Sequence, residues 1–117
     1  LGPYPGVREL LSQLCRTYKL ATLSNTNELF WERFKSTDIF DLFHLHFPSF
    51  KMGILKPDPG IFLQVINSTG LQAGQIIFFD DFLPNVEAAQ STGIEAYQVS
   101  GPAELKSLLM TLDLIGQ

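Results

Sequence analysis

The sequence is poor in the residue types that stabilise secreted domains or attract nucleic acid. Only one of its 117 residues is a cysteine, Cys15, so no disulfide can form within the chain, which indicates a reducing, cytoplasmic setting. Eight Lys and Arg residues against twelve Asp and Glu residues give a formal net charge of −4, and the basic residues form no cluster. Because nucleic acids and anionic membranes bind clustered positive charge, we expect neither as a partner.

Long apolar runs and an initiating methionine are also absent. No stretch approaches the roughly 20 apolar residues that cross a membrane, and no signal peptide or low-complexity tract is visible. The chain opens on Leu1-Gly2-Pro3 and leads almost at once into a helical pattern. We therefore expect one folded unit that has been cut from a longer protein.

Helical spacing of apolar residues alternates along the chain with short, continuous apolar runs. The pattern predicts a loop at 49–59, helices at 6–18, 28–35, 59–69, 83–92 and 102–112, and strands at 20–23, near 47, at 76–79 and at 94–99. Asn27 and Asp58 are suited to begin helices, and Gly70 and Gly93 to end them. Short strands alternating with helices predict an α/β fold with a parallel sheet covered by helices on both faces.

Polar residues follow three of the predicted strands. Ser24-Asn25 follows the first, Lys56 lies in the loop after the second, and Asp80-Asp81 follows the third. In open parallel sheets ligands bind beyond the carboxyl ends of the strands, so these groups are directed toward one rim. Each cluster alone also has an ordinary interpretation, as a turn, a solvated loop lysine or a helix cap. Their joint occurrence favours a phosphate or metal site.

These side chains together suit phosphoryl transfer. Adjacent carboxylates can bind Mg²⁺, which prefers oxygen ligands and keeps several waters. A serine hydroxyl and a loop N–H can hold phosphoryl oxygens, and a lysine can stabilise the negative charge that develops on them.

Three segments resemble the second, third and fourth motifs of the haloacid dehalogenase-like (HAD) hydrolases, in the order of that family. They are KLATLSNTNELF, GILKPDPGIF and IIFFDDFLPNVEAAQSTGIEAY, and the opening PYPGVRELLSQL resembles the return from the family's cap domain. The double aspartate is similar to that of subfamily IA, which includes sugar-phosphate phosphatases. The resemblance implies a three-layer Rossmann-like core, of which residues 1–117 form a part.

The resemblance implies roles for three residues at the phosphoryl group. Ser24 would hydrogen-bond the transferring group, with help from the backbone of Asn25. Lys56 would stabilise the same group and the nucleophile.

It also implies a Mg²⁺ site at the double aspartate. Asp80 and Asp81 would bind the ion, one of them directly and the other directly or through water. Asn85 would support these ligands without touching the ion, although a polar residue early in a helix is an alternative interpretation. Because the dehalogenases of this superfamily need no metal, the double aspartate favours the phosphatase branch.

The first motif of the family, Asp-x-Asp, does not occur anywhere in these 117 residues. The resemblance implies that its first aspartate is the nucleophile that forms an aspartyl-phosphate and that its second is the general acid and base. A cap domain that selects the substrate would be missing as well. We therefore expect the C-terminal portion of a Mg²⁺-dependent phosphatase, inactive alone, that acts on a small phosphorylated metabolite in the intact protein.

The resemblance places the absent strand at the centre of the sheet, between the strands predicted at 20–23 and 76–79. Its absence leaves two apolar strands with unpaired edges, which invites aggregation or strand exchange. Three arrangements would restore pairing: the two strands pair directly, a second copy supplies a strand in a homodimer, or a separate N-terminal segment completes the sheet. A monomer in which the two strands flank an empty slot would exclude all three.

Several residues are better explained by packing than by chemistry. His44 and His46 could form a metal pair, but strand or loop histidines are the preferred interpretation. Trp31 is expected to pack on a helix. The phenylalanines could form either core or a partner surface, and we favour core for the set Phe40, Phe43, Phe47 and Phe50.

Two functions from different classes remain open. The chain is either part of a phosphomonoesterase or a non-catalytic binding or dimerisation module that keeps weak anion affinity at Ser24 and Lys56. A response-regulator receiver shares these residue types but places the acidic pair early and the lysine last. The reading frame upstream of Leu1 distinguishes the first two, because an Asp-x-Asp after an apolar run there supports the enzyme and a start codon near Leu1 opposes it.

Overall fold

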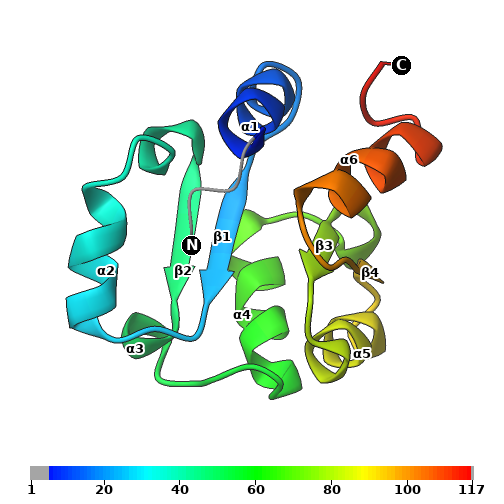
Figure 1. The fold of residues 1–117 in the computed structure, drawn as a ribbon. Helices are drawn as coiled ribbons and strands as arrows, with labels where there is room; N and C mark the ends of the chain where they lie inside the picture. Colours follow the sequence, from blue (N-terminus) through cyan, green and yellow to red (C-terminus); the bar gives the residue numbers. More distant parts are fainter. Residues whose placement is uncertain (1–5, 117) are drawn as a thin grey trace.

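The computed structural model describes residues 6–116, in which helices and parallel strands alternate (Figure 1). The α-helices and strands in chain order are α1 (Val7–Cys15), β1 (Ala21–Ser24), α2 (Glu28–Lys35), β2 (Leu45–Pro48), α3 (Ser49–Met52), α4 (Pro59–Thr69), β3 (Ile77–Asp80), α5 (Leu83–Ser91), β4 (Glu95–Gln98) and α6 (Pro102–Thr111). Short 3-10 helices, η1 (Phe40–Leu42) and η2 (Ala73–Gln75), precede β2 and β3. The predicted α/β class with parallel strands is confirmed, while residues 1–5 of the predicted opening lie outside the described residues.

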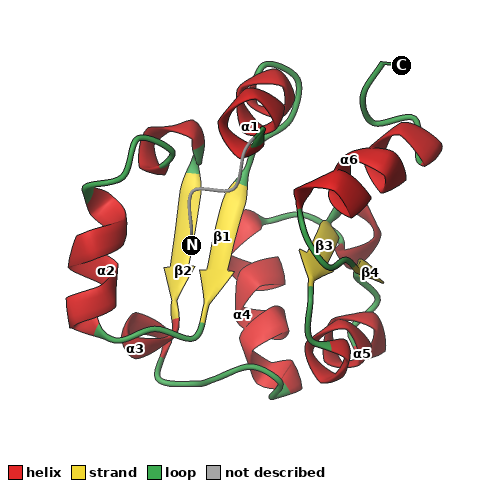
Figure 2. Cartoon of the chain, in the orientation of Figure 1, coloured by secondary structure: helices red, strands yellow, loops and turns green. Residues whose placement is uncertain are grey.

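The four strands form two separate two-stranded parallel sheets. β1 pairs with β2, which brings Ser24 opposite Pro48, and β3 pairs with β4, which brings Asp80 opposite Gln98. Figure 2 shows the β1–β2 pair on the left and the β3–β4 pair on the right. The sheet is therefore divided between β1 and β3, where the family resemblance implies an absent strand. Of the three arrangements that would restore pairing, direct pairing of these two strands does not occur.

β1 and β3 each have one edge that no strand within residues 6–116 pairs. The carbonyl of Leu20 accepts hydrogen bonds from the start of β2, and the carbonyl of Ile76 accepts one from the start of β4. Because successive backbone groups of a strand point to opposite edges, Ala21, Leu23 and Ile77 direct theirs toward the open edges. The two other predicted arrangements require residues from a second chain or segment, and the oligomeric state in solution decides between them and an empty slot.

A hydrophobic cluster on one face of the strands connects the two sheets. Ile61 and Phe62 of α4 and Val86 of α5 are buried in it, and Leu23 of β1 and Phe78 of β3 pack against them. The Phe62 and Phe78 rings meet edge to face with centroids 5.1 Å apart. Helix α4 therefore contacts strands from both sheets, in agreement with its place between them in Figure 1.

A second cluster covers the opposite face. Leu10 of α1 and Leu109 of α6 are buried, and Leu20 and Phe79 pack against this cluster. Phe79 follows Phe78 directly, and adjacent residues of a strand point to opposite faces of a sheet. Helices therefore cover both faces, as predicted, and the two clusters hold β1 and β3 in one body although the strands do not pair.

The limits of the helices follow from capping residues that the sequence predicted. The Asn27 side chain accepts a hydrogen bond from the Phe30 amide at 3.0 Å, and the Asp58 side chain accepts one from the Gly60 amide at 2.9 Å. Gly70 ends α4 with a φ of 69°, in the left-handed region that glycine adopts without steric cost. Capping chemistry thus sets the boundaries of the helices that flank the polar rim.

Helix α3 was not predicted. The segment 49–59 was expected to be a loop, but Ser49–Met52 form a single helical turn that ends at Gly53, where φ is 71°. One turn contains too few residues to produce a helical period in the sequence.

An aromatic cluster around Trp31 fixes α2 against β2. Trp31 is buried, and its ring centroid lies 5.7 Å from that of Phe40 and 5.3 Å from that of His46. His46 stacks on Phe40 at 4.2 Å, and its Nδ1 lies 2.8 Å from the Thr22 hydroxyl oxygen. Burial lowers the pKa of His46 below its ordinary value, so the ring is neutral at pH 7. The predicted packing role of Trp31 is confirmed.

The packing interpretation also accounts for His44, whose Nδ1 accepts a hydrogen bond from the Leu20 amide at 2.9 Å. No group of three or more His, Cys, Asp or Glu side chains that could hold a metal ion occurs within residues 6–116. Of the four phenylalanines expected in the core, Phe50 is 39% exposed, so that prediction is wrong for this residue. No helix in the described part of the chain has the length and apolar content to cross a membrane.

Replacing Phe62 by alanine tests the cluster that joins the two sheets. Phe62 is 1% exposed, and we expect Phe62→Ala to lower the free energy of unfolding by about 3–5 kcal/mol, because it leaves a cavity between α4 and β3. Its neighbour Leu63 is 55% exposed, so Leu63→Ala should change the stability by less than about 0.5 kcal/mol. Urea unfolding followed by circular dichroism measures both, and equal losses would contradict the assignment.

Candidate active site

The ends of β1 and β3 and the loop between α3 and α4 meet in one polar rim. Its centre is an ion pair in which Lys56 Nζ lies 2.8 Å from Asp80 Oδ2. The two side chains are only 10% and 9% exposed. The interpretation of Lys56 as a solvated loop lysine is therefore wrong.

Asp80 receives three hydrogen-bond donors. Besides Lys56 at Oδ2, the Phe82 amide donates to Oδ1 at 2.9 Å and Asn85 Nδ2 donates to Oδ2 at 3.3 Å. Burial alone would raise the pKa of Asp80, but the hydrogen bonds from Lys56 and the Phe82 amide, with the Lys56 charge, outweigh it and lower the pKa. Asp80 is therefore a carboxylate at neutral pH. The hydrogen bond from the Phe82 amide also places Asp80 in a turn after β3, which is the ordinary interpretation that the sequence allowed for the Asp80-Asp81 pair.

Asn25 links the end of β1 to the lysine loop. Its Oδ1 accepts a hydrogen bond from the Lys56 amide at 2.8 Å, and its Nδ2 donates to the Lys56 carbonyl at 3.1 Å. The family resemblance implies a role for the backbone of Asn25, and the structure adds these two contacts of its side chain with Lys56. Nothing in the sequence pattern signals a contact across 31 positions.

Ser24 and Asp81 lie at the rim without joining this network. Ser24 is the last residue of β1 and is partly buried, and its hydroxyl has no hydrogen-bond partner among residues 6–116. Asp81 is exposed, and Gln98 Nε2 donates to its main-chain carbonyl at 3.2 Å. Within residues 6–116 the Ser24 hydroxyl is therefore available to a ligand, and the Asp81 side chain lies beside Asp80, whose pKa it helps to lower.

Asn85 lies in the first turn of α5 and is 6% exposed. Its Nδ2 contacts Asp80, but its Oδ1 has no hydrogen-bond partner in the described part of the chain. A buried acceptor without a donor typically costs about 1–3 kcal/mol. The interpretation of Asn85 as a plain polar residue of the helix start leaves this oxygen unexplained.

The donor atoms fit part of a Mg²⁺ site. Two adjacent carboxylates and an amide oxygen are ligands of the kind that Mg²⁺ prefers, and the exposed Asp81 leaves room for retained waters. Against this, the Lys56 ammonium already neutralises Asp80. The described residues therefore offer such an ion two adjacent carboxylates, one of which is already paired with Lys56.

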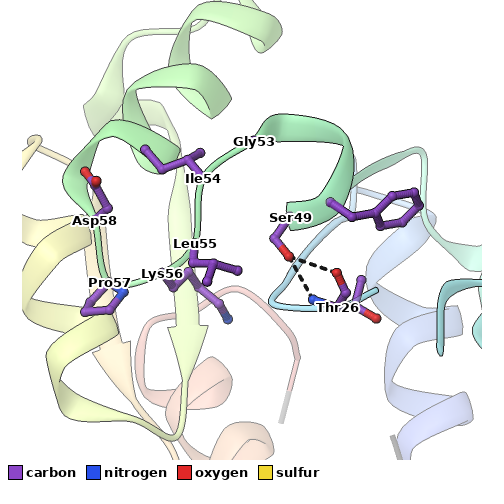
Figure 3. Close-up of a pocket in the computed structure, with 9 residues that line it drawn as sticks. Thr26, Ser49, Gly53, Ile54, Leu55, Lys56, Pro57 and Asp58 are labelled. Atoms are coloured by element: carbon purple, nitrogen blue, oxygen red, sulfur yellow. Dashed lines mark hydrogen bonds between the residues drawn. The ribbon is translucent and has the colours of Figure 1, made fainter. Parts of the chain in front are cut away.

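A hollow of about 710 Å³ adjoins Lys56 on the side of α3 (Figure 3). The Ser49 hydroxyl is buried in its wall, where it accepts a hydrogen bond from the Thr26 amide at 2.9 Å and donates to the Thr26 carbonyl at 3.0 Å. Sequence reasoning missed this residue, because α3 itself was not predicted. The lining residues are Thr26, Ser49, Phe50, Gly53, Ile54, Leu55, Lys56, Pro57 and Asp58.

Comparison with known proteins identifies the family of this chain. Residues 1–93 match the haloacid dehalogenase-like hydrolase family, and the chain belongs to that family. It is 30% identical over 99 residues to phosphatase MT3486 of Mycobacterium tuberculosis, covering 82% of this chain and 46% of that protein. It is 33% identical over 93 residues to a phosphorylated carbohydrates phosphatase of Thermotoga maritima, covering 78% of this chain and 43% of that protein. The chain thus spans somewhat under half the length of these curated relatives.

Solved structures give the same family. A HAD family enzyme of Bacteroides thetaiotaomicron, in complex with magnesium and inorganic phosphate, superimposes with a TM-score of 0.78 at 30% identity. The match covers 86% of this chain and 54% of that enzyme. A predicted HAD-like hydrolase of Porphyromonas gingivalis superimposes with a TM-score of 0.82 at 26% identity, over 95% of this chain and 58% of that one.

The lowered pKa of Asp80 makes the stability depend on pH in a defined direction. A carboxyl group whose pKa is depressed in the folded state adds stability above its unfolded value of about 3.8, and this is lost as the pH falls through the folded value. Urea unfolding between about pH 7 and pH 2 should show this loss. Asp80→Asn should remove that part of the slope and, by leaving Lys56 unpaired, should cost about 3 kcal/mol at pH 7. Glu87→Gln, at an exposed position of α5, should keep that part of the slope, and a flat profile in the native chain would contradict the assignment.

Proposed function

We propose that the chain supplies the phosphate-binding and metal-binding half of a Mg²⁺-dependent phosphomonoesterase site. The observation that supports this most strongly is the 2.8 Å Lys56–Asp80 pair, which is buried at the strand ends near Ser24 and the exposed Asp81. A buried ion pair contributes little net stability, so its presence here favours a chemical role. The substrate would be a small phosphorylated metabolite, such as the phosphorylated carbohydrates in the name of the Thermotoga relative.

In this proposal Ser24 and Lys56 act on the phosphoryl group. The Ser24 hydroxyl would donate to a phosphoryl oxygen, as would the amide of Asn25. The Lys56 ammonium would turn from Asp80 toward the same oxygens and toward the nucleophile, where it stabilises the charge of the transition state. Phosphoryl transfer depends mainly on such positioning and electrostatics.

Asp80 and Asp81 would hold the Mg²⁺ ion, which supplies a positive charge that offsets the phosphoryl oxygens during transfer. Asn85 would orient Asp80 through Nδ2, which is 3.3 Å from Oδ2. Its unpartnered Oδ1 would accept from a bound water or from the completing segment. Such outer contacts fix the orientation of metal-binding carboxylates.

The nucleophile would come from a strand that enters between β1 and β3. Both strands direct backbone groups toward that gap, and their carboxyl ends flank Lys56, so a strand parallel to both would end at the rim. A separate N-terminal segment would supply both the strand and the nucleophile, whereas a second copy of the chain, which has no Asp-x-Asp motif, would supply a strand alone. On this proposal residues 1–117 are a partial core domain that is inactive alone.

A non-catalytic binding or dimerisation module is the second candidate. The observation that favours it is the internal neutralisation of Asp80 by Lys56, which pairs this carboxylate within the chain itself. Such a module would use the open edges of β1 and β3 for association and would need neither a nucleophile nor a metal.

An activity assay separates these two candidates. The isolated chain should not hydrolyse an aryl phosphate in the presence of Mg²⁺, because no Asp-x-Asp motif is present. Co-expression with the segment encoded upstream of Leu1 should give activity, and Lys56→Ala or Asp80→Ala should lower kcat/KM by about 100-fold or more. Lys106→Ala, on the exposed side of α6, serves as the control. Activity of the isolated chain that Asp80→Ala abolishes would contradict the missing nucleophile.

Hydrogen exchange tests the entry of a strand between β1 and β3. In the isolated monomer the amides of Ala21 and Ile77 should exchange rapidly, because they point to open edges. Association with a second copy or with the upstream segment should slow both by about tenfold or more, whereas the amide of Thr22, which faces β2, should change little. Light scattering on the same sample gives the oligomeric state. A monomer whose Ala21 and Ile77 amides stay unprotected with the upstream segment present would rule out completion.

A further inference from the structure

Lys56 is held at both ends by residues from different parts of the chain. Its ammonium lies 2.8 Å from Asp80, and its main chain exchanges two hydrogen bonds with the Asn25 side chain, at 2.8 and 3.1 Å. An asparagine side chain carries one acceptor and one donor, so it can imitate a backbone amide and pair with a peptide unit. Asn25 thereby extends the end of β1 to the lysine loop.

The loop that carries Lys56 has few other attachments. Within the described part of the protein, the main chain of residues 54–57 hydrogen-bonds to one residue outside the loop between α3 and α4, and that residue is Asn25. Leu55 is 59% exposed and Pro57 is exposed, so the residues on either side of Lys56 add little packing. The position of the Lys56 Cα therefore depends on Asn25.

The position of the Cα decides where the ammonium can reach. Lysine has a flexible four-carbon side chain, and water hydrates its ammonium group strongly. A shift of the Lys56 Cα therefore breaks the buried pairing with Asp80, because the ammonium is equally well satisfied by solvent. Lys56 Nζ also lies 5.7 Å from the centroid of the Phe78 ring, which places it against the apolar end of β3. Without its tether the side chain would exchange this buried position for solvent.

We infer that Asn25 is a positioning residue, whose side chain holds the backbone of Lys56 so that the Lys56 ammonium stays beside Asp80 at the polar rim. Its catalytic meaning rests on the proposed phosphatase function, in which Lys56 stabilises the phosphoryl group. The tether itself does not depend on that function, so the two can fail separately. It also adds to the role implied by family resemblance, which concerns the Asn25 backbone alone.

Competitive acetylation of the intact 117-residue chain, quantified for each lysine by mass spectrometry, tests this inference. In the native chain Lys56 should be the least reactive of the five lysines, because its side chain is 10% exposed and ion-paired, whereas Lys106 is exposed. Asn25→Ala should raise the Lys56 rate relative to Lys106 by about fivefold, the effect of losing one or two hydrogen bonds. Asp80→Asn should raise it too, which shows that protection reports the ion pair.

Asn27→Ala is the matched control. Asn27 lies two residues further along and caps α2 through the Phe30 amide at 3.0 Å, without contacting Lys56. It should lower stability and leave the Lys56 to Lys106 ratio unchanged. Equal Lys56 reactivity in Asn25→Ala and the native chain would overturn the inference while leaving the proposed function intact.

A measurement on the native chain decides the case if Asn25→Ala does not fold. The Lys56 amide donates to Asn25 Oδ1, so its hydrogen exchange should be slower than that of the neighbouring Leu55 amide by about fivefold or more. Exchange of the Lys56 amide as fast as that of Leu55 would show that no tether exists.

Discussion

The arrangement of this protein depends on the need of backbone N–H and C=O groups for partners. β1 and β3 are short, apolar and parallel to their neighbours, which is typical of strands at the centre of a sheet. Each nevertheless has one edge without a partner among residues 6–116, and none of their residues is fully buried. Buried backbone groups are almost always paired, so an inner strand with an open edge is a position that another strand can occupy.

The helices explain why the two edges keep their places. The cluster of α4 and α5 on one face and that of α1 and α6 on the other both include residues of β1 or its flank and of β3. Hydrophobic contact is not directional, so it can join two sheets across a gap that hydrogen bonds do not cross.

The polar contacts at the rim add the directionality that packing lacks, because Asn25, Lys56 and Asp80 form a chain of hydrogen bonds from the end of β1 to β3. A buried ion pair is weak evidence for stability, and replacement by apolar side chains often leaves stability equal or improved. The presence of this pair at the strand ends is therefore consistent with the proposed role of Lys56 and Asp80 in phosphoryl transfer.

Local structure was largely predictable from the sequence because short-range rules govern it. The periods of the apolar residues located α2 and α4, and Asn27 and Asp58 cap them as predicted. The residues of the rim could be selected because strand ends in parallel sheets converge. The hydrogen-bond partners of these residues could not be predicted, because they lie far apart in the sequence. The contact of the Asn25 side chain with Lys56 spans 31 positions, and that of Ser49 with Thr26 spans 23. The division of the sheet was anticipated from the family resemblance, which implies an absent strand between 20–23 and 76–79, and not from the apolar runs, which show that a strand is inner without showing what lies at its edge.

The charges of the rim bear on the choice between a catalytic part and a passive module. The rim holds one basic side chain, Lys56, and two acidic ones, Asp80 and Asp81, so the formal charge of these three groups is negative. A phosphate monoester is itself an anion, and weak anion binding by the chain alone would have to overcome this repulsion. A further carboxylate from an entering strand would increase it. A divalent cation held by the two carboxylates would reverse this balance and would leave Lys56 to face the phosphoryl oxygens. On the proposed function, the charges of the rim thus favour anion binding that depends on a metal over the metal-free anion affinity of a passive module.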